Sequence, residues 1–444
     1  MLGPRPRRLP IAPVAEPARR HLPLANEVRP IDRESRPRYA VWELTLRCDL
    51  ACRHCGSRAG KARPDELSTR EALDVVGQLA EMGTEEVTLI GGEAYLHEGW
   101  LEVAQAISAA GMDFTMVTGG RGVTRDMAQA LRDAGAQAVG VSVDGFEELH
   151  DALRGVKGAF RSAMQTIDYV KEQGLRVSVN SQISRPALRQ MEPLVDHLMD
   201  RGVEAWQVAM TVPMGRAADE PDLLLQPYQV LEVLPMIARV ERRARARDVD
   251  VAPGNDIGYF GPYEAQLRAR QGGVRPACTA GRQTLGIEAD GSIKGCPSLP
   301  TKDYVGGNLK DHRLVDIWER AEPLRFTRHR PSSEMWGFCG TCYYRDACKG
   351  GCSWTAHVLF GRRGNNPYCH HRALELLDEG LRERIVQVER AAGQPFDYGR
   401  FECITEPWPE DELPAALALA ESGEGFLDAE RSSSGSRQQR NPSG

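Results

Sequence analysis

The sequence predicts an α/β fold in which a sheet of parallel strands is followed by a small cysteine-rich domain. Between Tyr39 and residue 212, short apolar runs alternate with amphipathic stretches. Seven of the 11 cysteines then fall between Cys278 and Cys369. With 444 residues, of which 41% are hydrophobic, the chain is long enough for two or three domains.

Six apolar runs are predicted as strands, at residues 40–46, 87–90, 114–118, 138–143, 176–183 and 205–212. The first helix between them is well marked, because Ser68-x-x-Glu71 forms a capping box and Gly83 ends the apolar face. A long helix with a solvent-exposed basic run is expected at residues 227–247. Six β-α units in a row imply a parallel sheet with right-handed crossovers.

A cysteine triplet follows the first predicted strand. Cys48, Cys52 and Cys55 have the spacing Cys-x3-Cys-x2-Cys. Three thiolates on one loop can hold three irons of a cubane cluster and leave the fourth iron without a protein ligand. The alternative is a zinc site, which would need His54 or a distant residue to complete four closed ligands.

The triplet resembles that of the radical S-adenosylmethionine (SAM) superfamily, and Gly91-Gly92-Glu93 after the second strand strengthens the resemblance. The resemblance implies a partial (β/α)6 barrel with SAM on the open iron. It places His54 near the adenine, and Gly91, Gly92 and Glu93 at the methionyl amino group. Glycines permit close backbone approach, and a carboxylate pairs with an ammonium.

Further candidate SAM contacts lie at the end of the fourth strand. Ser142 and Asp144 end that strand and Arg154 follows. In related enzymes a serine and an arginine at these places contact the ribose and the carboxylate, which suits the arginine fork. The alternative is a surface loop with an ordinary salt bridge. Asn180 and Gln182 are expected either to face the substrate or nucleoside, or to form hydrogen bonds with buried backbone groups.

The second cysteine block resembles the SPASM domain of peptide-modifying radical SAM enzymes, which carries two auxiliary iron–sulfur clusters. A β-hairpin is expected around Asp290-Gly291. The resemblance assigns auxiliary cluster I to Cys278, Cys296 and Cys352, and auxiliary cluster II to Cys339, Cys342, Cys348 and Cys369. Seven ligands leave one cluster short, so the three-cysteine cluster has an open iron, a non-cysteine ligand or a different nuclearity. One or two zinc sites are the alternative, and Cys403 is expected to be structural.

These features divide the chain into five segments. Residues 1–38 are predicted as a disordered Pro- and Arg-rich arm. The barrel covers residues 39–250, and a linker follows at 251–277. The cysteine-rich domain covers 278–400, and residues 401–444 form an extension whose tail is expected to be disordered from about residue 415.

The resemblance implies an oxidoreductase that cleaves SAM to a 5′-deoxyadenosyl radical after reduction by an external flavodoxin- or ferredoxin-like donor. Residues 54–60, 118–122 and 351–357 resemble a subgroup of peptide maturases whose peptides carry a Tyr and a downstream Gly-Asp-Leu motif. The implied reactions on a ribosomally made peptide are tyramine excision, a crosslink or a thioether. Alternatives are a haem or quinone-cofactor enzyme, a sulfatase-activating enzyme, or a zinc-stapled scaffold.

Composition limits the remaining possibilities. A net charge of −6 argues against nucleic-acid partners. No apolar run approaches the length of a membrane span, and the N-terminus lacks the apolar core of a signal peptide. We therefore expect a cytoplasmic protein, in which many cysteines favour metal over disulfides. No catalytic acid or base is assigned. The candidates are Asp144, Arg216, Asp256 and Tyr259, and each is expected to be structural.

Overall fold

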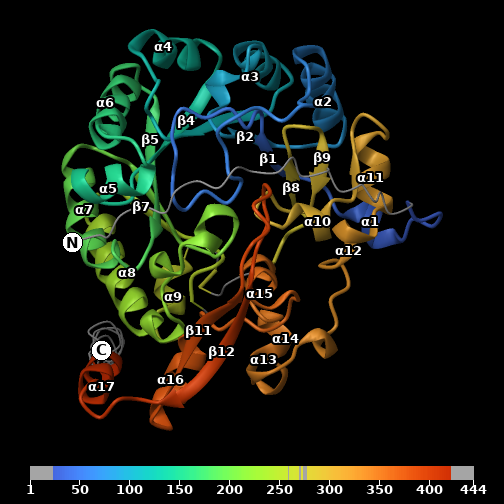
Figure 1. The fold of residues 1–444 in the computed structure, drawn as a ribbon. Helices are drawn as coiled ribbons and strands as arrows, with labels where there is room; N and C mark the ends of the chain where they lie inside the picture. Colours follow the sequence, from blue (N-terminus) through green and yellow to red (C-terminus); the bar gives the residue numbers. More distant parts are fainter. Residues whose placement is uncertain (1–23, 259, 270–271, 274–277, 422–444) are drawn as a thin grey trace, which may run out of the picture.

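The centre of the molecule is one ten-stranded sheet with the order β10-β9-β8-β1-β2-β3-β4-β5-β6-β7 (Figure 1). The computed structural model describes residues 24–258, 260–269, 272–273 and 278–421. The strands from β1 to β7 run parallel to their neighbours. In chain order these strands are Tyr39–Glu43, Glu86–Ile90, Asp113–Thr118, Ala136–Ser142, Arg176–Ile183, Ala205–Met210 and Asp250–Pro253.

Seven helices connect these strands and cover the outer face of the sheet (Figure 1). They are α2 (Thr69–Glu81), α3 (Trp100–Ala109), α4 (Arg125–Asp133), α5 (Glu147–Arg154), α6 (Ala159–Glu172), α7 (Leu188–Asp200) and α8 (Val230–Arg245). Outward strand residues such as Trp42, Phe114 and Val179 are fully buried. Alternate residues such as Thr115 and Asn180 are only half-buried. The inner face of the sheet is therefore the more polar and accessible one.

All six predicted strands are present, and Ser68 and Glu71 form the predicted capping box of α2. The parallel α/β fold and the cysteine-rich C-terminal part are confirmed. A seventh strand, β7, was missed, because residues 251–277 were assigned to a linker. β7 is only four residues long and ends at Pro253, so its hydrophobic pattern is weak, yet it pairs in parallel with β6.

The cysteine-rich part adds strands to the same sheet. β8 (Thr284–Ile287) pairs in parallel with β1, and β9 (Ser292–Lys294) pairs antiparallel with β8. The predicted hairpin is therefore correct, and Gly291 supplies its turn with φ +87°. β10 (Gly307–Asn308) completes this edge. The hairpin is thus a continuation of the barrel sheet.

Short helices surround the remaining cysteines, and a long hairpin follows them. The helices are α9 (Glu264–Leu267), α10 (Thr301–Tyr304), α11 (Leu314–Arg320), α12 (Glu322–Arg325), α13 (Phe338–Thr341), α14 (Arg345–Cys348), α15 (Ser353–Phe360) and α16 (His370–Asp378). β11 (Leu381–Glu389) and β12 (Arg400–Pro407) form the hairpin, and α17 (Leu413–Glu421) follows. The predicted boundary at residue 400 therefore cuts through a hairpin. The expectation of disorder was wrong for residues 415–421, and residues 422–444 lie outside the described part.

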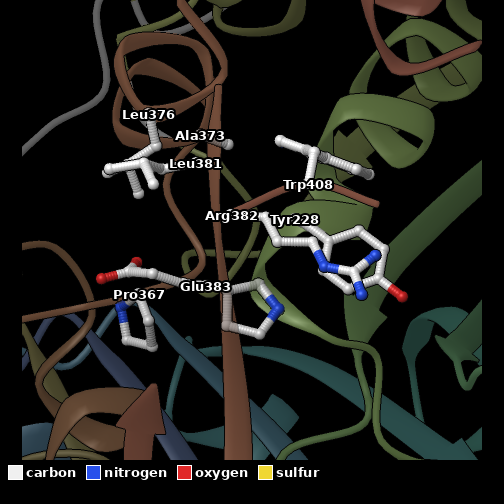
Figure 2. Close-up of a pocket in the computed structure, with 9 residues that line it drawn as sticks. Tyr228, Pro367, Ala373, Leu376, Leu381, Arg382, Glu383 and Trp408 are labelled. Carbon is white, nitrogen blue, oxygen red and sulfur yellow. The ribbon is translucent and has the colours of Figure 1, made fainter. Parts of the chain in front are cut away.

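The base of this hairpin is closed by an aromatic cluster. The guanidinium of Arg382 lies 4.9 Å from the ring centre of Tyr228 and 5.2 Å from that of Trp408 (Figure 2). These side chains line a shallow crevice. No cysteine and no predicted SAM contact is among its lining residues, so we assign the crevice to packing.

One further expectation needs correction. Residues 30–34 form helix α1 (Pro30–Glu34), whose Asp32 is fully buried and bonds to Arg328 at 2.9 Å and to Arg325 at 3.1 Å. The predicted disordered arm therefore does not include residues 24–38, whereas residues 1–23 lie outside the described part. The basic run of α8 is solvent-exposed as expected at Arg242, Arg245 and Arg247, and the partly exposed Arg243 pairs with Asp196 and Glu192 of α7.

Candidate metal and cofactor centre

The cysteine triplet lies on the loop that leaves β1, held from one side by the end of α5. The amide of Ala51 donates to the carbonyl of Arg154 at 3.0 Å, and that of Arg53 donates to Leu153 at 2.8 Å. Gly155, with φ +70°, ends α5, and a Cβ there would lie 2.5 Å from the Ala51 carbonyl oxygen. The contact therefore depends on glycine at this position.

Arg216 holds the same loop from the other side. Its guanidinium donates to the carbonyl oxygens of Cys52 and, at 3.0 Å, of Ala59. Its own amide donates to the carbonyl of Cys55 at 3.0 Å. Arg216 is thus a structural anchor of the cysteine loop, as expected for it. Asp256 accepts the Met210 amide at 2.6 Å, at the end of β6. Tyr259 lies outside the described residues.

Gly91 and Gly92 lie against the backbone that leads into the triplet. The amide of Gly92 donates to the Thr45 carbonyl and that of Glu93 to the Arg47 carbonyl, each at 2.7 Å. A Cβ on Gly92 would lie 2.0 Å from the Arg47 oxygen, and one on Gly91 would lie 2.4 Å from the Thr45 oxygen. The close approach that these glycines permit in this structure is to the cysteine loop itself.

The three thiols differ in burial and receive hydrogen bonds. Cys52 is buried, whereas Cys48 and Cys55 are partly exposed. Backbone amides lie 3.4 Å from the sulfurs of Cys48 and Cys55, and Arg154 Nη1 donates to Cys52 Sγ at 3.7 Å. Burial raises the pKa of the Cys48 thiol to about 12. Metal ligation would offset this cost by displacing the proton. The donor set therefore fits an iron–sulfur cluster.

Two carboxylates adjoin Cys48. One oxygen of Asp49 and one of Glu93 lie within 4.8 Å of each other and of the Cys48 sulfur. Glu93 is buried and accepts the Thr118 hydroxyl at 2.6 Å and the Gly119 amide at 2.7 Å. Burial raises its pKa to about 7, although these two hydrogen bonds oppose the shift. Sequence reasoning missed Asp49, although its place directly after Cys48 was a usable signal.

Asp144 links His54 to Arg154. Its Oδ2 lies 2.6 Å from Arg154 Nη2 and 3.2 Å from His54 Nε2, and the Asp144 side chain is 1% exposed. Burial alone would raise the pKa of Asp144, but Arg154 and His54 hold it well below its usual range. The structure thus brings three predicted SAM contacts together beside Cys52. Ser142, at the end of β4, is half-buried and in register with Asn180.

Several buried polar atoms around the loop have no hydrogen-bond partner. They are Asp49 Oδ1, His54 Nδ1 and Arg154 Nε. Buried polar atoms are usually paired, so such a group indicates a polar ligand. A carboxylate oxygen suits an ammonium, a guanidinium suits a carboxylate, and an imidazole suits a heterocycle edge. The residues present therefore fit SAM.

The distal cysteines gather in the two predicted groups. Cys278 and Cys296 pack with Tyr304, Phe326 and Trp354, and burial with the nearby Cys278 and Cys352 raises the pKa of Cys296 to about 12. In the second group Cys339 lies near Cys342, and Cys369 lies near Cys348 and Cys339. The assignment of ligands to clusters stays a prediction. Cys403 lies on β12, opposite Ile385.

Comparison with known families agrees with this arrangement. The Radical SAM superfamily matches residues 42–183, and the SPASM family, described as an iron–sulfur cluster-binding domain, matches residues 278–343. This chain is a radical SAM enzyme with a SPASM domain. It uses SAM, a 4Fe–4S cluster that binds SAM, and auxiliary clusters in the SPASM domain.

Relatives of this chain include enzymes of different activities. The chain is 29% identical to an AdoMet-dependent heme synthase of Oleidesulfovibrio alaskensis, over 76% of this chain and 87% of the relative. It is also 29% identical to the mycofactocin maturase MftC of Mycobacterium tuberculosis, over 83% of this chain and 90% of the relative. The structure of Streptococcus suis SuiB bound to S-adenosylmethionine is similar in fold, with a TM-score of 0.60 and 17% identity over 77% of this chain and 78% of SuiB.

In this radical SAM enzyme the two cysteine regions are in contact. Trp354, two residues after Cys352, donates its indole N–H to Met214 Sδ at 3.2 Å. The methyl of Met214 lies 2.9 Å from where a Cβ on Gly56 would be, directly after Cys55. The same indole packs in the apolar cluster of Cys278 and Cys296. One tryptophan and one methionine thus connect the triplet to the three-cysteine group.

The connection between β11 and β12 adds a second contact. The Phe396 amide donates to the Gly56 carbonyl at 3.1 Å, and Arg58 Nε donates to Asp397 at 2.8 Å. Phe396 has φ +56°, an uncommon conformation for a non-glycine residue. Within the described ranges, no helix is long and apolar enough to cross a bilayer. The expected cytoplasmic location stays a prediction.

Proposed function

We propose that this radical SAM enzyme oxidatively modifies a ribosomally made peptide. The similarity to mycofactocin maturase supports the peptide class. The observation that carries the proposal is the contact from Gly56 through Met214 to Trp354, because it joins the SAM-binding loop to the three-cysteine group. Oxidation needs both sites close together, since the substrate must lose a hydrogen atom and then an electron.

The residues around the cysteine loop have distinct roles in this proposal. Cys48, Cys52 and Cys55 would hold the SAM-binding cluster. When bound, the cluster and SAM supply a radical that removes hydrogen from an unactivated carbon. Asp49 and Glu93 would receive the methionyl ammonium, and Arg154 would receive the carboxylate, held in place by Asp144 at 2.6 Å. Burial of these groups keeps water out and fixes their orientation.

The inner face of the barrel offers contacts to a peptide. Asn180 and Gln182 of β5 are half-buried, and Gln207 of β6 is exposed. Asn180 and Gln207 are paired in register, so their side chains point to the same face. Amide side chains donate and accept at once, which matches the donors and acceptors of a peptide backbone. We assign the substrate to this face.

Mass spectrometry tests the proposal. The enzyme is reconstituted anaerobically with iron and sulfide, then incubated with SAM, a reductant and the peptide encoded beside its gene. A mass change of the peptide that requires Cys48, Cys52 and Cys55 supports the proposal and identifies the reaction. Peptide of unchanged mass, under conditions in which SAM is cleaved, contradicts it. Dithionite and a flavodoxin- or ferredoxin-like protein are compared as electron donors.

A haem-precursor reaction is the second candidate, because the heme synthase relatives match at the same identity over most of the chain. The same reconstituted enzyme is offered a porphyrin precursor of haem in place of the peptide. Conversion of the porphyrin with no change to the peptide would select this candidate. If the protein takes up zinc and no iron and never cleaves SAM, the result would favour the zinc-stapled scaffold.

A further inference from the structure

Each of the three cysteine groups has one buried arginine beside it. Arg154 donates to Cys52 in the SAM-binding loop. Arg372 is 5% exposed and interacts electrostatically with Cys339 of the four-cysteine group. Arg330 is 4% exposed and interacts electrostatically with Cys278 of the three-cysteine group. A buried cation requires a nearby anion, because removing it from water is costly.

Two of these arginines have a close, buried carboxylate. Arg154 Nη2 lies 2.6 Å from Asp144, whose side chain is 1% exposed. Arg372 Nη2 lies 2.5 Å from Glu383, whose side chain is 8% exposed. In both cases the protein supplies the counter-charge itself. The cysteine groups beside them therefore experience a largely neutralised ion pair.

Arg330 lacks such a partner. Its nearest carboxylate, Glu334, lies 3.3 Å from Nε and is 34% exposed. The same Glu334 oxygen lies 3.7 Å from Arg363, so two cations share one half-exposed anion. Arg330 Nη1 donates to Ser353 at 3.1 Å, whereas its Nη2 is buried without a hydrogen-bond partner. The local charge is positive, and one N–H group remains unused.

The second arginine, Arg363, packs beside the same cysteine group. The guanidinium of Arg363 lies 4.3 Å from the ring centre of Phe326 and donates to the Tyr304 hydroxyl at 3.2 Å. Phe326 and Tyr304 pack in one apolar cluster with Cys278 and Cys296. Lys294 also interacts with Cys296, but Glu288 neutralises it at 2.7 Å. The excess positive charge at this group therefore comes from the two arginines.

We propose that Arg330 directs its unpaired N–H toward the cluster held by Cys278, Cys296 and Cys352, and that it makes this cluster the more easily reduced of the two auxiliary clusters. Reduction adds one negative charge, which an unneutralised cation and an N–H···S bond both stabilise. Arg372 Nε is also buried without a hydrogen-bond partner, so the two groups differ in charge: Glu383 neutralises Arg372, whereas Arg330 has no such buried carboxylate. The inference rests on the auxiliary clusters of the proposed function but not on the identity of the substrate.

An anaerobic redox titration followed by electron paramagnetic resonance tests the inference. The Cys48→Ala, Cys52→Ala, Cys55→Ala variant serves as the background, so that only auxiliary clusters give signals. In this background Arg330→Gln should move the midpoint of one auxiliary signal to a more negative potential. Glu334→Gln should move the same signal in the opposite direction, because it removes the shared anion. The other auxiliary signal should not move.

Arg362→Gln is the matched control. It removes the same charge one residue from Arg363, but its side chain is exposed over Trp336 and screened by solvent. It should leave both midpoints unchanged.

Three results would overturn the inference. In the first, the Arg330→Gln variant keeps full iron and both midpoint potentials stay unchanged. In the second, Arg330→Gln loses iron and Glu334→Gln leaves both midpoint potentials unchanged. Zinc in place of iron in the triple-alanine background would overturn the auxiliary-cluster assignment as well. Because the titration uses no peptide, a failure of the proposed peptide reaction cannot be mistaken for any of these.

Discussion

Replacing Gly92 with alanine should disable the SAM-binding loop without changing a predicted ligand of the cluster. A Cβ at this position would lie 2.0 Å from the carbonyl oxygen of Arg47 and 2.5 Å from its carbonyl carbon. Both atoms belong to the backbone directly before Cys48, so no side-chain rotation can relieve the clash. A normal carbon–oxygen contact of about 3.3 Å or more requires the two segments to separate by over about 1 Å.

The energetic cost follows from the contacts that such a separation breaks. Overpacking a tight site costs about 1–3 kcal/mol. The amides of Gly92 and Glu93 each donate across this contact at 2.7 Å, and each lost hydrogen bond adds about 0.5–1.5 kcal/mol. The total of about 2–6 kcal/mol corresponds to a loss of the native loop geometry by roughly 30-fold or more.

Two measurements check this prediction. SAM cleavage by the reconstituted Gly92→Ala enzyme under dithionite should fall by at least that factor. The iron content should fall by about one cubane cluster, about four irons, because the auxiliary cysteines are unaffected. Gly77→Ala is the control, since nothing lies within 4 Å of a Cβ there, and alanine favours a helix by about 1 kcal/mol. Unchanged cleavage and full iron in Gly92→Ala would refute the role given to this contact.

Three further outcomes are expected. Alanine at Cys48, Cys52 and Cys55 together should abolish SAM cleavage while iron analysis still finds the auxiliary iron; cleavage that survives would disprove the triplet assignment. Asp32→Asn should lower the thermal unfolding midpoint, because Arg325 and Arg328 would lose their shared carboxylate, at a cost of about 3–5 kcal/mol. An unchanged midpoint would show that this buried ion pair does not stabilise the fold. Burial raises the pKa of Glu43 to about 7, so the folded state holds a proton that the unfolded state releases above about pH 4.5. The contribution of Glu43 to the free energy of unfolding should therefore decline as pH rises through about 7. Thermal melts at pH 6 and pH 8 should show this decline in the unchanged protein and not in Glu43→Gln. An identical decline in both proteins would contradict the raised pKa.

Local sequence signals were sufficient wherever the structure depends on neighbours along the chain. The capping box of Ser68 and Glu71 gave the start of α2, and Asp290-Gly291 gave the turn of a hairpin. The spacing of Cys48, Cys52 and Cys55 indicated a metal loop, because three ligands on one short segment need no long-range information. The strand pattern gave the parallel sheet for the same reason.

Contacts between distant segments carried no such signal. Arg216 holds the carbonyl of Cys52 across 164 positions, and Arg58 holds Asp397 across 339. An arginine in a turn-rich stretch looks the same whether it faces solvent or a buried carbonyl. The positive φ of Phe396 could not be predicted from the sequence either, because it results from the contact of the β11–β12 connection with Gly56.

The pairing of β8 with β1 has the largest consequence for function. Because the two strands share one ladder, Cys296 is fixed relative to the strand that leads into Cys48; a Cβ on Gly286 of β8 would lie 2.8 Å from the Cys296 carbonyl carbon. Arg63, which follows the triplet, bonds to Glu288 of the hairpin at 2.7 Å. A hinge between the two cysteine regions would have to break this sheet and a buried ion pair. The spacing between the SAM-binding loop and the three-cysteine group is therefore set by the fold, so the substrate must adjust to a fixed pair of sites.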